Sequence, residues 1–311
     1  QLTSGAFPQL FLGDFVNLSQ QRKDEVSRNV MAAISKLHEN QLSNGGFTYW
    51  KGGKYADAWV TSYIGQFFVE AEKKGYVLPS DSKQQWLNYQ NNEARSWMHN
   101  ARYQNDFEQA YRLYTLALAG NPNVGAMNRL REIDDLSDNG KRMLAAAYAL
   151  AGQKQTAQKL FNTLNLEEDS GYYYGSVVRN KAMALETALL IGKREDAGRW
   201  ALEIADKLSS NDWMSTQTTA YALYAMAKYA AINKSGKTFN ASYTFGGKTE
   251  QITSKTPMTS IVLPTKGDKQ PLSVKNNAQQ TLYVRLISSG QLPVGKELVM
   301  QNGLSIRTSF R

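Results

Sequence analysis

The chain of 311 residues contains no cysteine and only two histidines, His38 and His99. Without cysteine, these residues form no disulfide, no thiolate metal site and no cysteine nucleophile. The two histidines lie far apart in the sequence, and no pattern of metal ligands or of serine and aspartate accompanies them. The sequence therefore indicates no metal site, no cofactor and no catalytic residue of these kinds.

Long apolar runs are also absent. None approaches the roughly 20 residues that span a bilayer, and the sequence shows no recognisable secretory leader. The hydrophobic fraction of 42% is nevertheless enough for a core. The first segment, QLTSGAFPQLFLG, already has apolar residues at helical spacing, whereas a natural N-terminus is usually polar and frayed. We therefore expect this chain to be a fragment of a longer protein.

Acidic residues are scarce only in the last quarter of the chain. Residues 1–233 contain 25 Lys and Arg against 24 Asp and Glu, whereas residues 234–311 contain 11 against 3. The lysines of the second segment are scattered through polar, strand-like sequence without clustered arginines. This distribution is typical of solvated strand faces and protected sheet edges. We therefore expect no nucleic-acid partner.

The apolar residues of the first three quarters of the chain follow a helical period. They predict helices over 25–41, 59–76 and 84–101. From there the chain repeats itself, because alanine-rich helices end at Gly120, Gly152 and Gly192 and a more charged helix follows each of them. Self-similarity at this period indicates stacked helix pairs, in which the small-residue helix packs inside and the charged helix faces water.

The fold class that these patterns predict is mainly α. We expect an α/α toroid of about six helix pairs over residues 1–233, with an open solenoid as the alternative. Residues 234–311 change to a period of two and predict a small antiparallel β domain, with Gly246-Gly247 as a hairpin turn. Its strands are expected in the segments 237–252, 260–265, 271–276 and 281–290, and residues 301–311 read as the start of a further domain.

A glycine-flanked loop is unusually rich in aromatic residues. The segment GGFTYWKGGKYADAWVTSY, residues 45–63, runs from this loop into a predicted helix. Aromatic side chains this dense mark either a binding surface or a plug at one end of the helix ring. The aromatic residues are Phe47, Tyr49, Trp50, Tyr55 and Trp59.

Three separated motifs, in order, resemble the thioester-containing domain of the α2-macroglobulin and complement superfamily, and its bacterial members most. The segment QLTSGAFPQLFL, residues 1–12, is similar to the family's continuation "TSxAFPQLYL" after Cys-x-Glu-Gln. Residues 45–63 resemble "GGFxYWPGG…DPWVTAY", and STQTTAYALYAMAKY, residues 215–229, resembles the last inner helix. The resemblance covers roughly residues 1–290.

The resemblance implies a role for Gln1, which falls on the glutamine of the thioester motif. Gln1 would be the acyl donor of an internal thioester with a cysteine three positions upstream. The resemblance further implies that Phe47, Tyr49, Trp50 and Trp59 shield the thioester or form an interface. The protein would be an endopeptidase inhibitor rather than an enzyme, and a lysine of a trapped protease would attack the thioester.

The partners and compartment also come from the resemblance. Proteases and other domains of the parent chain are the expected partners. The family is exported, and its bacterial members lie in the periplasm or cell envelope, often as lipoproteins. One alternative is a family member without a thioester, which acts as a scaffold or non-covalent clamp.

A second alternative is a carbohydrate-active enzyme, because α/α toroids also host glycosidases and lyases. Such an enzyme needs a carboxylate pair across an aromatic cleft. Asp212 is also expected to cap the last inner helix. The carboxylates available for such a pair are Asp57, Glu70, Asp134, Asp135, Asp169 and Asp212.

Overall fold

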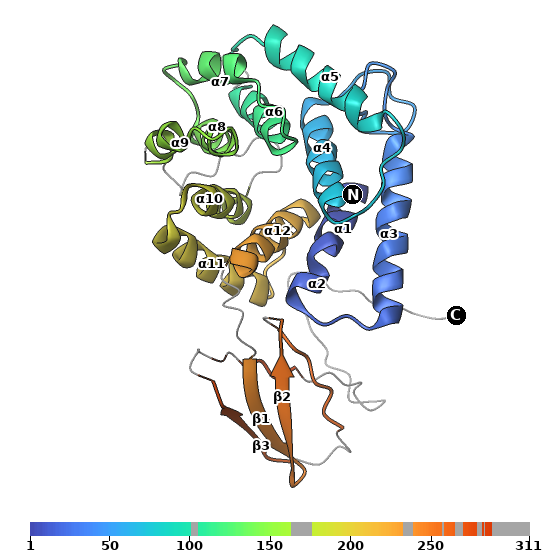
Figure 1. The fold of residues 1–311 in the computed structure, drawn as a ribbon, viewed down its shortest axis with the longest axis vertical. Helices are drawn as coiled ribbons and strands as arrows, with labels where there is room; N and C mark the ends of the chain where they lie inside the picture. The colour runs from blue at the N-terminus through green and yellow to red at the C-terminus, as the bar shows by residue number, and fades with distance from the viewer. Residues whose placement is uncertain are drawn as a thin grey trace, which may run out of the picture. The chain divides into compact units, whose positions relative to one another are not determined.

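The computed structural model describes residues 1–100, 105–162, 176–232, 239–256, 258–264, 270–278, 282 and 284–287 (Figure 1). Its contacts divide the chain into two compact units. The first comprises Gln1–Phe239 with Thr253–Lys266, and the second comprises Asn240–Ile252 with Gly267–Arg311.

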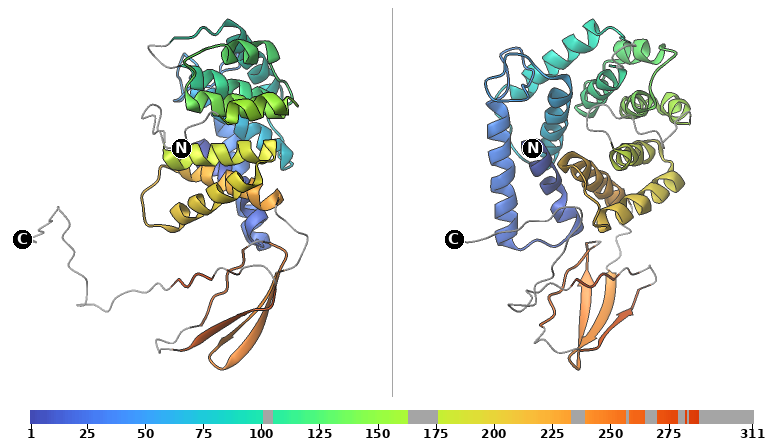
Figure 2. Two further views of the ribbon diagram at one scale, coloured as in Figure 1. Left: turned by 90° about the vertical axis from the view of Figure 1, so that its left-hand side faces the viewer. Right: turned by 180° about the vertical axis from the view of Figure 1, so that it is seen from behind.

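The first unit is a closed double ring of helices, visible from the front in Figure 1 and from behind in Figure 2. Each inner element packs against the next, and the last one, α12, packs against η1 and α1, which closes the ring. The predicted α/α toroid is therefore confirmed. The inner elements are α1 (Leu2–Ala6) with the 3-10 helix η1 (Phe7–Phe11), α4 (Ala58–Lys73), α6 (Asp106–Leu118), α8 (Asp138–Leu150), α10 (Val177–Ile191) and α12 (Thr216–Ile232).

The outer helices lie outside this ring. A short helix, α2 (Leu12–Phe15), connects η1 to the first of them. The outer helices bury only one face; α3, for example, buries Val26, Val30 and Ile34. A helix of this kind covers the inner ring with its apolar stripe and presents polar residues to water. They are α3 (Gln20–His38), α5 (Ser82–Ser96), α7 (Val124–Arg131), α9 (Lys154–Phe161) and α11 (Arg194–Ser209).

Sequence signals fix the ends of the inner helices. Asp57, Ser137 and Ser176 accept a hydrogen bond from a backbone N–H of the first turn of α4, α8 and α10. Such N-caps satisfy donors that have no partner inside the helix. The glycines that end the repeats, Gly120, Gly152 and Gly192, have φ angles of 78°, 80° and 81°. A glycine adopts this left-handed conformation without steric cost, and it ends the helix.

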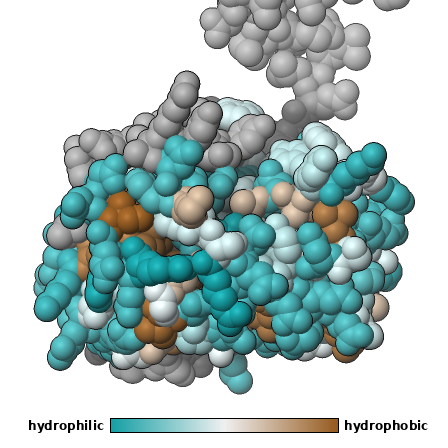
Figure 3. Space-filling view, turned by 90° about the horizontal axis from the view of Figure 1, so that it is seen from above, coloured by the Kyte–Doolittle hydropathy of each residue, from teal (hydrophilic) through white to brown (hydrophobic). Residues whose placement is uncertain are grey.

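The face seen from above in Figure 3 is mainly hydrophilic, and its apolar residues form separate spots. Within the described ranges, no helix combines the length and the apolarity that crossing a membrane requires. The same ranges contain no group of three or more His, Cys, Asp or Glu residues that could hold a metal ion.

The sheet of the β region contains β1 (Phe239–Phe245), β2 (Lys248–Ser254) and β3 (Leu272–Asn276) in the order β2-β1-β3. β1 and β3 are antiparallel, with Ala241 opposite Asn276 and Phe245 opposite Leu272. Gly246 and Gly247 have φ angles of 57° and 78°, as a two-residue hairpin turn requires.

Two strand predictions are wrong where the structure describes the chain. Residues 260–264 and the described residues of 281–290 form no strand. Val262 and Ile287 are exposed, so these short apolar runs do not supply the inward face of the sheet. The remaining residues of these segments, and residues 301–311, lie outside the described ranges.

Candidate functional site

The inner helices run parallel and begin at one end of the toroid, which we call the mouth. Ser4 Oγ lies 3.3 Å from the hydroxyl of Tyr63 on α4. Along η1, the ring of Phe7 lies beside that of Tyr221 on α12, and the ring of Phe11, one turn later, lies beside that of Tyr224, also one turn later. Because residue numbers rise together in these contacts, α1 and η1 run parallel to α4 and α12. Gln1 therefore lies at the mouth, at the end where α4 and α12 begin.

Gln1 is the N-cap residue of α1 and is exposed. Its backbone carbonyl accepts the N–H of Gly5 at 2.9 Å, whereas its side chain makes no capping hydrogen bond. Within the first turn of α1, Thr3 and Ser4 are buried. The first turn of α1 is thus held by the ring, while Gln1 itself stands at the edge of the mouth.

Trp59 forms the aromatic wall of the mouth. Its ring stacks on Tyr111 at 4.7 Å and on Phe107 at 5.6 Å between centroids. The guanidinium of Arg179 lies over the same Trp59 ring, 5.3 Å from its centroid, and donates to Gln217 Oε1 at 3.2 Å. Trp59 is only 8% exposed, so its main contacts are inside the ring.

The structure splits the aromatic loop into two parts. Phe47 is fully buried and packs edge-on against Phe68, with ring centroids 5.6 Å apart. Tyr49 and Trp50, by contrast, are 50% and 75% exposed and contact each other. Of the four aromatic residues predicted for the site, Phe47 and Trp59 belong to the core, and Tyr49 and Trp50 lie on the surface.

Two of the carboxylates proposed for an enzymatic alternative, Asp57 and Glu70, take part in other interactions. Asp57 caps α4 by accepting the N–H of Val60 at 2.8 Å. Glu70 is buried and forms ion pairs of 3.0 Å with both Lys73 and Lys228. Asp57 thus has a role in helix capping, and Glu70 has a role in ion pairing.

Asp212 does not cap α12, which corrects the prediction. The N–H of Thr218 donates to Ser215 Oγ at 3.1 Å, whereas Asp212 pairs with Lys207 at 3.1 Å. Asp135 lies on the surface, 3.3 Å from His99. Asp134 is also exposed. Asp169 lies outside the described residues.

Sequence reasoning missed a hydrogen-bond network on the axis of the toroid. Tyr111 and Tyr221 both donate to Gln66 Oε1, at 2.6 and 2.9 Å. Deeper in the ring, Tyr114 and Tyr224 both donate to one oxygen of Glu186, at 2.7 and 2.6 Å. The sequence signal was the Tyr-x-x-Tyr spacing in α6 and α12, since residues three apart share one face of a helix.

Burial governs the protonation of this network. Desolvation raises the pKa of Glu186, although the hydrogen bonds from Tyr224 and Tyr114 oppose the shift. Desolvation also raises the pKa of Tyr111, Tyr114 and Tyr224 well above the ordinary value. The tyrosines therefore remain neutral donors at physiological pH.

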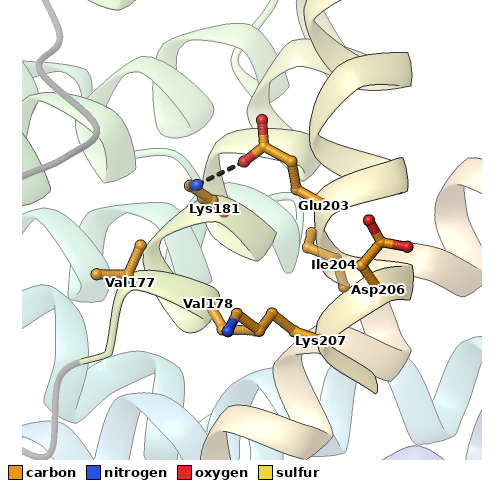
Figure 4. Close-up of a pocket in the computed structure, with 7 residues that line it drawn as sticks. All are labelled: Val177, Val178, Lys181, Glu203, Ile204, Asp206 and Lys207. Carbon is orange, nitrogen blue, oxygen red and sulfur yellow. Dashed lines mark hydrogen bonds and ion pairs between the residues drawn. The ribbon is translucent and has the colours of Figure 1, made fainter. Parts of the chain in front are cut away.

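A shallow pocket lies between the inner helix α10 and the outer helix α11 (Figure 4). Its volume is about 270 Å³, and Val177, Val178 and Ile204 form part of its wall. Lys181 and Glu203 neutralise each other there through an ion pair of 2.5 Å. This pocket contains none of the residues that the sequence predicts for the site, and its paired charges do not indicate a catalytic arrangement.

Comparisons with known proteins agree with the fold and the motifs. No family model matches the chain. Alpha-2-macroglobulin of Escherichia coli is 25% identical over 98% of this chain and 19% of that protein, and alpha-2-macroglobulin of Rickettsia conorii is 25% identical over 100% and 17%. The chain thus spans about a fifth of the length of these relatives.

Solved structures show the same architecture. A crystal structure of native E. coli alpha-2-macroglobulin, from domain MG7 to the C-terminus, superposes with a TM-score of 0.63 at 20% identity, over 88% of this chain and 43% of that one. Salmonella alpha-2-macroglobulin reacted with methylamine superposes with a TM-score of 0.64 at 18% identity, over 88% and 18%. In sequence and in fold, this chain is similar to the bacterial alpha-2-macroglobulins.

Proposed function

We propose that this chain is the helical module of an alpha-2-macroglobulin-like inhibitor that traps proteases, and that it is not an enzyme. Its relationship to the bacterial proteins supports the proposal, and solved relatives include trypsin-activated and elastase-activated forms. The observation that carries it is the position of Gln1, which is exposed at the mouth on the first turn of a helix that the ring holds. A reactive group there is accessible and yet rigidly supported.

The proposed chemistry joins Gln1 to a cysteine three residues upstream. Residues at i and i+3 face each other across one helical turn. The thiol attacks the Gln1 side-chain carbonyl, ammonia leaves, and an internal thioester results. When a lysine amine of a protease then attacks the acyl carbon, an amide bond forms, the thiolate leaves, and it takes up the proton that the amine loses. The reaction of a Salmonella relative with methylamine, a small amine, agrees with this chemistry.

The aromatic residues of the motif have separate roles in this proposal. Trp59 and Phe47 hold the wall of the mouth, because they are buried in the ring. Tyr49 and Trp50 form an interface with another domain or with the protease, because exposed aromatic side chains are typical of contact surfaces. Export to the periplasm or cell envelope is part of the same proposal.

The experiment is to incubate the protein that carries this chain with trypsin and to separate the products on a denaturing, reducing gel. A covalent trap gives a new band at the combined mass, and the substitution Gln1→Ala removes it. If trypsin activity falls without any such band, the alternative of a non-covalent clamp in the same family is correct and the thioester proposal fails.

A further inference from the structure

Arg142 is a buried cation that forms no ion pair with another described residue. It belongs to the first turns of α8 and is 1% exposed. Its guanidinium donates to the side-chain oxygen of Asn139, a neutral group, and its Nε has no hydrogen-bond partner. None of the ion pairs among the described residues includes it. A buried charge without a counter-charge is strongly destabilising, so this position calls for an anion.

The surroundings of Arg142 carry further positive charge. The pKa of Arg142 is lowered to about 10, mainly by burial and in smaller part by the positive charge of Arg179 on α10, so the two guanidinium groups are within electrostatic range. Arg179 is also 1% exposed. Asp138 acts in the opposite direction on Arg142, but its carboxylate already lies 3.6 Å from Lys141.

Asn180 on α10 is a second buried polar residue without a hydrogen-bond partner. It is 1% exposed, and neither its amide nitrogen nor its amide oxygen has a hydrogen-bond partner. Val178, two residues earlier, faces α11 (Figure 4). Two residues correspond to about 200° around a helix. Asn180 therefore projects to the opposite side of α10, the side on which α8 packs (Figure 1).

The N-termini of α8 and α10 add further positive electrostatic potential near Arg142 and Asn180. Both α8 and α10 begin at the mouth, and their capping serines, Ser137 and Ser176, accept backbone N–H groups at 3.0 and 3.1 Å. The N-terminus of a helix carries partial positive charge, which favours an anion. Arg142 and Asn180 each lie within about one turn of such an end.

We propose that the first turns of α8 and α10 enclose a small monovalent anion of the halide class, bound by the Arg142 guanidinium and the Asn180 amide nitrogen. Enclosure favours an ion of chloride's size, because the binding groups are fully buried. A single negative charge balances the unpaired cation. The site is separate from the chemistry proposed for Gln1, and its existence does not depend on a thioester.

The test uses the full chain in buffers of constant ionic strength, in which sodium chloride replaces sodium gluconate. Chloride raises the melting temperature of the wild type with a saturable dependence. The substitution Arg142→Gln abolishes that dependence, and so does Asn180→Leu, which removes the amide but keeps an apolar side chain of similar size. The matched control Arg199→Gln removes an exposed arginine, paired with Asp196 at 3.2 Å, and leaves the chloride dependence unchanged.

A bromide soak of wild-type crystals gives a second readout that needs no variant. The proposal predicts an anomalous peak between the first turns of α8 and α10, near Arg142 and Asn180. Two results overturn it: a melting temperature that is the same in chloride and in gluconate, or a bromide map without a peak at this place. Both results come from the wild-type protein alone, so the test does not depend on whether the variants fold.

Discussion

The hydroxyl of Tyr224 on α12 donates a 2.6 Å hydrogen bond to Glu186 on α10, and the Tyr114 hydroxyl on α6 donates to the same oxygen at 2.7 Å. These contacts join three inner helices across the axis of the toroid. The ring of Tyr224 also packs on Phe7, with centroids 5.2 Å apart, where α12 meets η1. Tyr224 thus takes part both in the axis network and in the contact between α12 and η1 that closes the ring.

Removing the Tyr224 hydroxyl is expected to destabilise the toroid. In Tyr224→Phe, Glu186 loses one of two donors inside the core, and the loss of a buried hydrogen bond to a charged or polar acceptor costs about 1–3 kcal/mol. The control Tyr55→Phe changes a tyrosine that is 86% exposed and should leave stability unchanged. Urea unfolding of both variants measures the difference, and equal stabilities would show that this link contributes nothing.

Glu186 should make stability depend on pH in a defined direction. Burial raises its pKa in the folded state above the ordinary value of 4.5, so the folded protein binds the proton more tightly than the unfolded chain does. Stability from this group is therefore fully present below 4.5 and is lost as the pH rises through the folded pKa.

Glu186→Gln tests this dependence, because the amide oxygen still accepts the tyrosine hydroxyls but does not titrate. Relative to the wild type, the variant should gain free energy of unfolding as the pH rises from about 4 to 7. Urea denaturation across this range measures the gap between the two proteins. A gap that stays constant would mean that Glu186 titrates alike in both states.

Gly65 and Gly198 should respond oppositely to alanine. A Cβ on Gly65 in α4 would lie 2.1 Å from the ring of Trp86, whose Nε1 donates to Thr61 O at 3.0 Å. Overpacking of this kind costs typically about 1–3 kcal/mol. At Gly198 in α11 the nearest atom is 3.7 Å away, so alanine should stabilise by up to about 1 kcal/mol through helix propensity. Thermal melts distinguish the two, and similar shifts would contradict this description of the α4–α5 contact.

Substitution of the two tryptophans of the aromatic segment should have different effects: Trp59 is expected to contribute to the stability of the fold, and Trp50 is expected to contribute to protease capture. Trp59→Ala removes a ring that is 8% exposed and stacked on three others, so it should cost about 3–5 kcal/mol. Trp50→Ala changes a ring that is 75% exposed and should leave the melting temperature unchanged. In the proposed interface role, Trp50→Ala instead weakens protease capture. Unchanged capture by a folded Trp50→Ala protein would remove that role.

Much of the ring was predictable because its helices obey local rules. Helical periodicity predicted α3 and α4, and most of the predicted helix ends lie within three residues of the observed ones. The repeated glycines end inner helices, as predicted. The helix predicted to reach residue 101 instead ends at Ser96, because Trp97 adopts an extended backbone with ψ of 135°. The helical spacing of apolar residues does not indicate where the backbone leaves the helical conformation.

The candidate site was less predictable for the same physical reason. The aromatic loop has no period, so the sequence did not reveal that Phe47 points into the core and Trp50 away from it. The Tyr-x-x-Tyr spacing places two tyrosines on one helix face but does not reveal their partners, because the bonds of the axis network join residues distant in the chain, such as Gln66 and Tyr221. These contacts exist only once the ring closes.

The most direct test of the account is the intact mass of the protein that carries this chain, measured before and after methylamine. The account predicts that the protein gains one methylamine, that one thiol becomes free, and that Gln1→Ala abolishes both changes. An unchanged mass in freshly prepared protein, without release of a thiol, would contradict the covalent mechanism. Gln1 would then be an ordinary residue at the start of α1.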